Sequence, residues 1–280
     1  MRFSKVSIQI PTYNQATQVV LAIESCLRQT YSNIEIIITD DNSGDDTATA
    51  IQKYLADGRV KYFRNDKNIG RVANYKKALY QYCSGDWVLN LDGDDYLTND
   101  NFISQAMELI IKEGEETVLF YQGAHVYKTA MAEKIVRPRI NGDTVIMPAS
   151  DYVKDIFFIR HFSHMATVYN RQKAMTLGFY EKDIISADMD SFLNLAIKHP
   201  KGKVILSMAI AGVWLQHDTN TSKSLHFKTH LKNFRMYFSL AKKMRNTPHF
   251  SNLSVYGWLI KAMFFYWRTY ISSLIKGTGS

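Results

Sequence analysis

The chain contains only two cysteines in 280 residues, Cys26 and Cys83. Each lies in an apolar, periodic segment, so both are expected to be reduced and buried, and a disulfide framework is excluded. No Cys-x-x-Cys pair is present, which argues against a structural zinc site. The sequence also lacks a Walker loop and has no Gly-x-Gly-x-x-Gly after its first predicted strand. These two absences argue against a P-loop NTPase and a dinucleotide-binding enzyme.

Acidic residues are absent after Asp218, whereas ten lysines and arginines lie between residues 219 and 280. Residues 1–218 therefore carry a charge of −2, and the remainder carries +10. A basic segment of this kind can bind nucleic acid, but no recognised nucleic-acid-binding module accompanies it, so that function is not expected. The chain is predicted to have a near-neutral body, residues 1–220, and a basic tail, residues 221–280.

The basic tail is predicted to form two helices, at residues 225–245 and 251–275. The second helix is rich in aromatic residues and is interrupted by Lys261 and Arg268. A membrane-spanning helix needs about 20 apolar residues with few charges, so an interfacial amphipathic helix fits this segment better. We therefore expect the tail to bind an anionic membrane surface. The alternative is an aromatic-rich helix that packs into the core or into a homodimer interface.

The first hundred residues alternate between the hydrophobic periods of strands and of helices. Strands are predicted at residues 6–10, 34–39, 60–63 and 87–91, with helices between them. This order predicts an α/β fold in which helices flank a mostly parallel central sheet. Beyond residue 100 the pattern is less regular, with a hairpin expected at residues 124–137 and a strand at 204–207. Ligands of such folds bind beyond the carboxyl ends of the strands, where the polar clusters of this sequence lie.

Three acidic clusters carry the chemistry that the sequence indicates. Asp40-Asp41 follows the second strand, where a carboxylate can accept a base N–H or ribose hydroxyls, or can simply stabilise a turn. Asp92-Gly93-Asp94-Asp95 follows the fourth strand, and its mutually repelling carboxylates predict a divalent cation that bridges them to phosphate. Asp188-Met189-Asp190 opens a helix, where an acid is favoured by the helix dipole and can also act as a general base.

These clusters belong to a longer set of segments with a characteristic order. The further segments are Val6-Ser7-Ile8-Gln9-Ile10-Pro11-Thr12-Tyr13-Asn14, Ser25-Cys26-Leu27-Arg28-Gln29-Thr30-Tyr31, Asn68-Ile69-Gly70 and Gly85-Asp86-Trp87. Together they resemble the family 2 glycosyltransferases, most strongly over residues 5–100, more weakly to residue 220, and not in the tail. The resemblance implies a GT-A fold, which is a Rossmann-like α/β domain, followed here by a C-terminal helical extension. Residues 1–100 would be the nucleotide-binding half and residues 101–220 the acceptor-binding half.

The resemblance implies that residues after the first two strands bind the nucleotide. Pro11, Thr12 and Tyr13 would line the nucleotide pocket. Asp41 would contact the base, with Asp40 beside it.

The resemblance also implies a metal site and a general base. Asp92 would face the ribose or the sugar, and Asp94 would ligate Mn²⁺ or Mg²⁺ on the diphosphate. His217 would lie near the metal or the diphosphate. Asp188 would deprotonate the acceptor, with Asp190 as the alternative base.

We therefore expect an inverting glycosyltransferase that moves a sugar from a nucleoside-diphosphate sugar, with UDP favoured, to a hydroxyl of a growing lipid-linked bacterial surface glycan. An O-antigen or capsule unit is one such acceptor. The alternatives are a transferase that uses a thymidine-diphosphate sugar such as rhamnose, and a non-catalytic nucleotide-binding relative. No signal-peptide pattern precedes the first strand, so we expect a cytoplasmic protein, peripheral at the inner face of the cell membrane.

Overall fold

The computed structural model describes residues 4–216 and 227–277. A ten-stranded sheet runs through these residues in the order β3-β2-β1-β4-β9-β6-β10-β5, with β7 paired to β6 and β8 paired to β10. The strands are β1 (Val6–Thr12), β2 (Ile34–Asp40), β3 (Val60–Arg64), β4 (Trp87–Asn90), β5 (Tyr96–Leu97), β6 (Val118–Lys128), β7 (Glu133–Val136), β8 (Thr144–Pro148), β9 (Thr167–Asn170) and β10 (Lys203–Leu215). The α-helices are α1 (Gln18–Leu27), α2 (Thr47–Ile51), α3 (Arg71–Lys77), α4 (Phe102–Glu113), α5 (Ala149–Ile159), α6 (Arg171–Leu177), α7 (Ala187–Lys198), α8 (Phe227–Arg245) and α9 (Asn252–Gly277).

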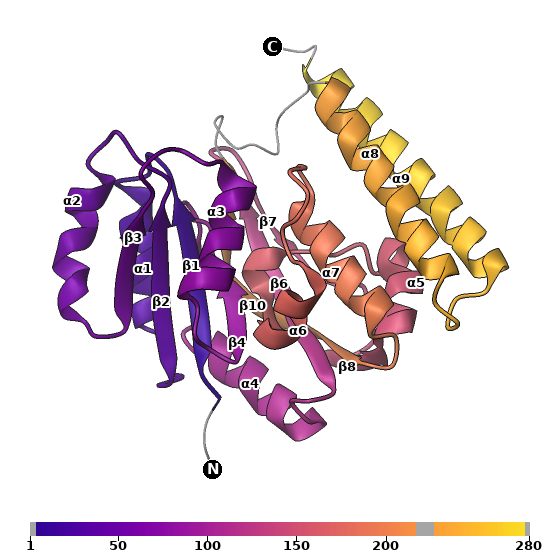
Figure 1. Cartoon of the computed structure of the whole chain (residues 1–280), viewed down its shortest axis with the longest axis horizontal. Helices are drawn as coiled ribbons and strands as arrows, with labels where there is room; N and C mark the ends of the chain where they lie inside the picture. Colours follow the sequence, from indigo (N-terminus) through magenta and orange to yellow (C-terminus); the bar gives the residue numbers. More distant parts are fainter. Residues whose placement is uncertain (1–3, 217–226, 278–280) are drawn as a thin grey trace.

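The first half of the sheet is parallel, as the alternating periods predict. β1 lies between β2 and β4, and β3 extends the sheet beyond β2, all in parallel. Every residue of β1 and β2 is buried. Strands covered by helices on both faces need apolar side chains in both directions, which explains the continuous β-branched run of β2. Figure 1 shows this half at the indigo end of the chain.

The second half of the sheet mixes strand directions, so the predicted mostly parallel arrangement is limited to the first half. β9 is antiparallel to both of its neighbours, β4 and β6. β6 and β7 form the antiparallel pair expected at residues 124–137. β10 is parallel to β6 but antiparallel to β5 and β8. It is also longer than predicted, because irregular register between Leu206 and Val213 breaks the apolar alternation that marks a strand in sequence.

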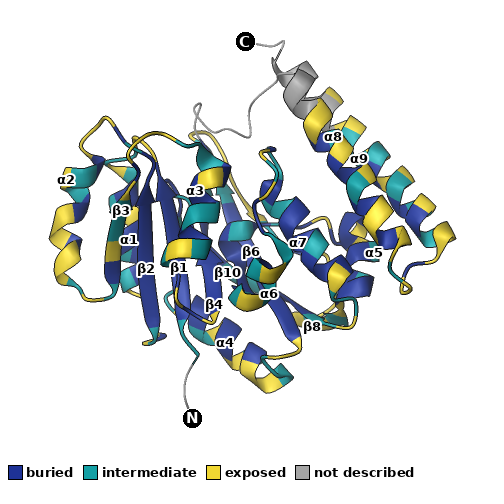
Figure 2. Cartoon of the chain, viewed as in Figure 1, coloured by how far each residue is buried: buried dark blue, intermediate teal, exposed yellow. Residues whose placement is uncertain are grey.

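Helices cover both faces of the sheet and create two hydrophobic cores. The first core contains apolar side chains of α1 and α4 packed on β1, β2 and β4. The second core contains those of α3, α5 and α7, packed on the opposite face. Figure 2 shows the central strands as buried and the outward faces of the helices as exposed. The carboxyl ends of β1 and β4 are held between these two layers.

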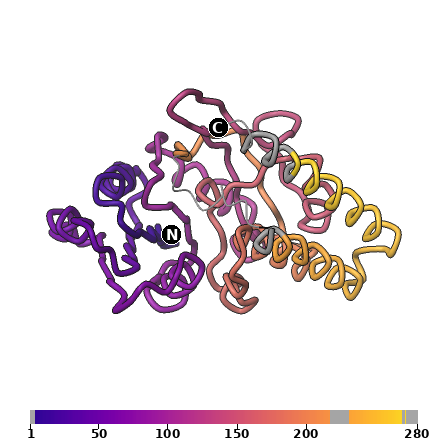
Figure 3. The backbone as a smooth tube through the Cα atoms, turned by 90° about the horizontal axis from the view of Figure 1, so that it is seen from above, coloured from indigo at the N-terminus to yellow at the C-terminus, as the bar shows by residue number. Residues whose placement is uncertain are grey.

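The two helices predicted in the basic tail are confirmed as α8 and α9, which pack against each other as a helical hairpin. Figure 3 shows this hairpin at the end of the molecule opposite the first strands. α8 contacts α7, and α9 contacts α5. The indole of Trp258 is buried and donates a hydrogen bond of 2.7 Å to the carbonyl of Val153. Among the described residues, no helix is long and apolar enough to cross a membrane.

Candidate active site

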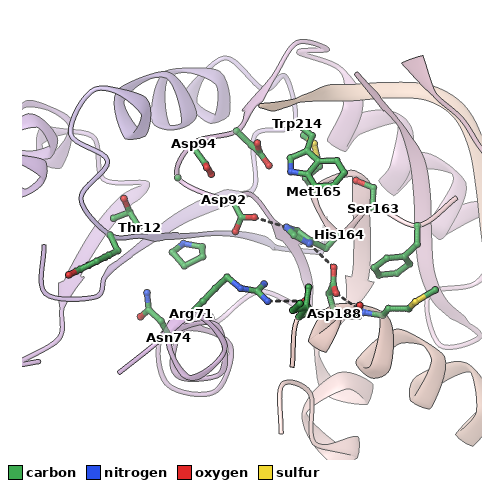
Figure 4. A pocket seen from close by; sticks show the side chains of 18 of the residues that line it. Thr12, Arg71, Asn74, Asp92, Asp94, Ser163, His164, Met165, Asp188 and Trp214 are labelled. Carbon is green, nitrogen blue, oxygen red and sulfur yellow. Dashed lines mark hydrogen bonds and ion pairs between the residues drawn. The ribbon is translucent and has the colours of Figure 1, made fainter. Parts of the chain in front are cut away.

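A cavity of about 920 Å³ opens beyond the carboxyl ends of β1 and β4. It brings together residues from both halves of the sheet, which the sequence separates by more than a hundred positions. The polar residues that line it include Thr12, Tyr13, Asp41, Arg71, Asn74, Asp92, Asp94, Asp95, His164 and Asp188. Figure 4 shows how several of them converge. The cavity therefore brings Thr12, Tyr13 and Asp41 of the predicted nucleotide site into one space with Asp94 and Asp188.

Backbone hydrogen bonds bring the segment after β4 beside the end of β1. The amide of Leu91 donates to the carbonyl of Gln9 at 3.0 Å, and the amide of Gly93 donates to the carbonyl of Pro11 at 3.1 Å. A Cβ atom at Gly93 would lie 2.9 Å from the Thr12 hydroxyl oxygen and 2.5 Å from a side-chain oxygen of Gln15. A side chain at position 93 would have to displace Gln15 and would crowd Thr12, so glycine lets this segment pack closely against the end of β1.

Asp92, Asp94 and Asp95 form a cluster in which one carboxylate oxygen of each lies within 4.8 Å of the others. Asp95 is buried, and one of its oxygens accepts a hydrogen bond of 2.9 Å from the amide of Leu215. Its other oxygen is buried without a hydrogen-bond partner in the described part of the chain. Burial and the charges of Asp92 and Asp94 raise the pKa of Asp95 well above the usual carboxylate range. This cluster has the oxygen donors and the uncompensated charge that a hard divalent cation would satisfy.

His164 joins Asp92 of the acidic cluster to Asp188, the predicted general base. Its Nε2 lies 3.1 Å from Asp92 and its Nδ1 lies 2.9 Å from Asp188, and Figure 4 shows the imidazole between the two carboxylates. Ionised carboxylates only accept hydrogen bonds, so both ring nitrogens donate and the ring carries a positive charge. Burial by itself would lower the pKa of His164, but the two carboxylates raise it to about 10.

The two carboxylates beside His164 are also held by other groups. The Tyr75 hydroxyl donates to the second oxygen of Asp92. The amide of Met189 donates to the second oxygen of Asp188 at 2.8 Å. Burial opposes ionisation of Asp92, yet the positive charge of His164 lowers its pKa to about 2. Asp188 is affected in the same way, and its pKa is lowered by the hydrogen bond from His164. Both acids are therefore ionised across the neutral range.

Arg71 adds a second positive charge to this part of the cavity. It is the first residue of α3, and its guanidinium donates a hydrogen bond of 3.0 Å to the carbonyl of Ile185. Burial disfavours the charged form, but the charges of Asp92 and Asp188 outweigh it and raise the pKa of Arg71. Arg71 thus links α3 to the segment that precedes the predicted base, and its charge offsets those of the two acids.

Most of the predicted nucleotide-side residues also line the cavity. Pro11, Thr12 and Tyr13 all line it, and Tyr13 is 48% exposed, so its ring is accessible to a ligand. Asp41 also lines the cavity, but both of its oxygens hold the loop that leads to α3. They accept from the amides of Ile69 and Gly70, each at 2.8 Å.

Asp40 differs from the prediction, because it is not among the residues that line the cavity. Its oxygens accept from the amide of Ser43 at 2.8 Å and from the Tyr62 hydroxyl at 2.6 Å. It is fully buried, so it stabilises the turn after β2 and offers no surface to a nucleotide. The alternative of turn chemistry that the sequence left open applies to Asp40.

Asp190, the alternative base, also lies outside the cavity lining. Its oxygens accept from the Lys182 ammonium at 2.8 Å and from the Asn194 amide at 3.1 Å. Asp188 is thus the acid of this cluster that faces the cavity. His217, expected near the metal, lies outside the described residues.

Sequence reasoning missed His164, Arg71 and the role of Asp95. His164 and Arg71 are single residues in otherwise unremarkable segments, and only the fold brings them to the acids. Asp95 did carry a signal, since it extends the acidic cluster, but its burial, and the lack of a partner for one of its oxygens within the described residues, are visible only in three dimensions.

The family model described as Glycosyl transferase family 2 matches residues 7–176, which is more than half of the chain. The chain belongs to glycosyl transferase family 2. One relative of this family 2 chain is the GalNAc(5)-diNAcBac-PP-undecaprenol beta-1,3-glucosyltransferase of Campylobacter jejuni, which is 35% identical over 132 residues. That match covers 46% of the chain and 39% of the relative, so it concerns only part of each protein.

Solved structures share the fold of this family 2 chain, which is the predicted GT-A fold. TarS 1-349 of S. aureus, in complex with UDP-GlcNAc, has a TM-score of 0.73 at 18% identity and matches 91% of this chain and 70% of its own. The mannosyltransferase PcManGT of Pyrobaculum calidifontis, in complex with GDP-Man and Mn²⁺, has a TM-score of 0.62 at 15% identity and matches 99% of this chain and 76% of its own.

Proposed function

We propose that this family 2 chain is a metal-dependent, inverting glycosyltransferase that moves a sugar from a UDP-sugar to a hydroxyl of a lipid-linked bacterial glycan. One observation carries the proposal. A single cavity contains both the acidic cluster at Asp92, Asp94 and Asp95 and the ionised Asp188, linked through His164. A donor held at the cluster would thus share its cavity with the carboxylate that we propose as the base.

The acidic cluster fits Mn²⁺ or Mg²⁺, because it offers carboxylate oxygens, including one buried oxygen of Asp95 that has no hydrogen-bond partner among the described residues. Asp94 and Asp95 are the residues that would hold the cation. When bound, the cation would offset the negative charge that develops on the departing nucleoside diphosphate. Asp92 is already engaged by His164 and Tyr75, which suits the predicted role toward the ribose or the sugar.

Asp188 is the group that would take the proton from the acceptor hydroxyl. A carboxylate that is ionised at neutral pH can accept this proton as the oxygen attacks the anomeric carbon from the face opposite the leaving group. One displacement inverts the anomeric centre, and it needs a single base, in contrast to the two carboxylates of glycosidases. His164 and the amide of Met189 fix the orientation of this carboxylate.

Similarity to known proteins supports the substrates that we propose. A structural neighbour is named with UDP-GlcNAc, and a relative is named for an undecaprenol-linked substrate. We propose that residues 1–100 bind the nucleotide and residues 101–220 the acceptor, because the cavity is lined from both ranges. An O-antigen or capsule unit would suit such an acceptor, and the enzyme would then be cytoplasmic and peripheral at the inner membrane face. A thymidine-diphosphate sugar donor and a non-catalytic relative are the alternatives.

The donor is tested by the thermal stability of the protein with UDP-, dTDP- and GDP-sugars, each with and without Mn²⁺. A ligand that binds only the folded state raises the temperature midpoint of unfolding. At a ligand concentration of a hundred times Kd, it adds about 2.7 kcal/mol to the free energy of unfolding. We expect the largest shift with a UDP-sugar, and we expect that shift to require Mn²⁺. A larger shift with the dTDP-sugars would assign the alternative donor. A UDP-sugar shift without release of UDP in the presence of extracts of lipid-linked glycans would favour the non-catalytic relative.

His164 should be needed to set the pKa of Asp188. In His164→Gln the positive charge is lost, so the pKa of Asp188 should rise, and the acidic limb of the rate against pH should move to higher pH. We expect kcat to fall by about 10- to 100-fold at neutral pH while KM for the donor changes less. The measurement is kcat and KM across pH for the wild type, for His164→Gln and for His164→Lys. The lysine variant restores a charge and should return the limb toward its original position. An unshifted limb would limit His164 to a packing role.

A further inference from the structure

Helix α9 presents a continuous apolar stripe on its outward face. Leu253, Ile260 and Phe264 are 84%, 68% and 71% exposed. The stripe consists of Leu253, Tyr256, Ile260, Phe264, Trp267 and Ile271, all of them exposed. Consecutive members are three or four residues apart, so they share one face of the helix over about 27 Å at 1.5 Å per residue. Scattered exposed apolar residues are ordinary, but a contiguous row of this length marks an interaction surface.

The stripe is bordered by positive charge. Lys261 and Arg268 are exposed, and helical periodicity puts both beside the stripe. The guanidinium of Arg245, on α8, lies 5.6 Å from the ring centre of Tyr256 and so borders the stripe as well. The chain after Asp218 contains no acidic residue that could offset these charges. An apolar row with flanking cations is complementary to a surface that has an apolar interior and anionic groups on its outside.

The opposite face of α9 packs against the rest of the protein. Val255, Trp258 and Ala262 are buried, and Trp258 contacts Phe157 of α5. Phe265 stacks at an angle against the same Phe157, with ring centres 5.9 Å apart, and it lines the active-site cavity. The helix therefore separates its apolar stripe, on one side, from the cavity, on the other. Figure 1 shows α9 at the side of the domain next to α5.

We infer that the α9 stripe is a docking surface for an anionic lipid bilayer, and that it holds the α5 side of the cavity next to the membrane. The stripe would lie at headgroup depth, with its aromatic rings at the interface and its cations toward anionic headgroups. The reason for this orientation rests on the proposed lipid-linked acceptor, since such an acceptor would reach the cavity from the membrane beside α9. The contact between the stripe and the bilayer does not depend on the reaction.

The test is co-sedimentation of the full chain with vesicles of phosphatidylcholine, with and without phosphatidylglycerol. We expect binding that requires phosphatidylglycerol and weakens in high salt. The variant Leu253→Ser/Ile260→Ser/Phe264→Ser should bind at least about tenfold more weakly, because it removes apolar side chains that would enter the interface. The matched control is Leu21→Ser/Ile111→Ser/Ile146→Ser, which changes three exposed apolar residues outside the tail and should bind like the wild type.

A second variant separates charge from apolar contact. Lys261→Glu/Arg268→Glu leaves the stripe intact and should lose at least about tenfold of its binding to phosphatidylglycerol vesicles. Unchanged vesicle binding by both variants would overturn the inference. A second outcome would also overturn it. The wild type would form a dimer without lipid, and the serine variant would be monomeric but would bind vesicles as the wild type does. The stripe would then be a contact between two copies of the chain. Failure of the proposed function would appear separately, as vesicle binding that persists in a protein unable to transfer a sugar.

Discussion

Asp94→Asn should reduce turnover with Mn²⁺ by roughly 1,000-fold, which corresponds to about 4 kcal/mol of lost transition-state stabilisation. The substitution keeps the size of the side chain but removes one of three carboxylates whose oxygens lie within 4.8 Å of one another. The cation would lose a charged ligand, and the leaving diphosphate would lose the charge compensation that the cation provides. Calorimetric titration of UDP, with and without Mn²⁺, measures the binding part of this loss.

The fold should tolerate this substitution, because Asp94 contributes repulsion to the cluster. Its charge is one of the causes that raise the pKa of Asp95, so an uncharged residue at position 94 removes one repulsion from the cluster, and the metal-free midpoint of unfolding checks that the fold is kept. The control is Asp46→Asn, an exposed acid at the start of α2, which should keep full activity. Unchanged affinity of Asp94→Asn for UDP in the presence of Mn²⁺ would contradict the metal role.

The acidic cluster itself was predictable from sequence, because adjacent carboxylates at a strand end repel one another unless something binds them. The different roles of the individual acids in this cluster could not be predicted from sequence. Asp94 and Asp95 have the same side chain in neighbouring positions, yet only the fold shows that Asp95 is buried, with one oxygen bonded to the amide of Leu215 and the other without a partner in the described ranges. The strand that supplies this amide, β10, follows Asp95 by more than a hundred residues.

The fold was predictable to the extent that local periodicity determined it. β1 to β4 alternate with helices, and the apolar, β-branched character of the buried strands β1 and β2 is visible in the sequence. The directions of β9 and β10 are not, because long-range pairing decides whether a strand is parallel or antiparallel to its neighbour. His164 lies in this second half, so its position between Asp92 and Asp188 could not be inferred from spacing.

The two interpretations of the tail were presented by the sequence as alternatives, but the structure shows features of both. Val255 and Trp258 pack into the core, as a core helix would, while Leu253 and Ile260 of the same helix are exposed. Hydrophobicity summed along the segment cannot separate these two faces. Their separation by helical periodicity is what makes the exposed face specific enough to test.

Asp188→Asn should strongly reduce sugar transfer while leaving donor binding intact. We expect kcat to fall by about 100- to 10,000-fold, the usual range for removal of a general base. An asparagine keeps an oxygen that can accept from the amide of Met189 or from His164, so the local geometry should survive. The amide cannot take a proton from the acceptor hydroxyl, and turnover should fall for that reason alone. The measurement is kcat with a saturating donor, together with the Kd of UDP in the presence of Mn²⁺.

Asp190→Asn is the matched control, since it makes the same chemical change two residues away on the same helix. Asp190 is paired with Lys182 and lies outside the cavity lining, so its replacement should lower the midpoint of unfolding but leave kcat within about threefold of the wild type. If Asp188→Asn stays active and Asp190→Asn does not, the base is Asp190, and α7 must rotate when substrates bind. If both lose transfer while both still bind UDP, the loss reflects the position of α7 and assigns the base to neither acid. Only selective loss in Asp188→Asn identifies the carboxylate beside His164 as the base.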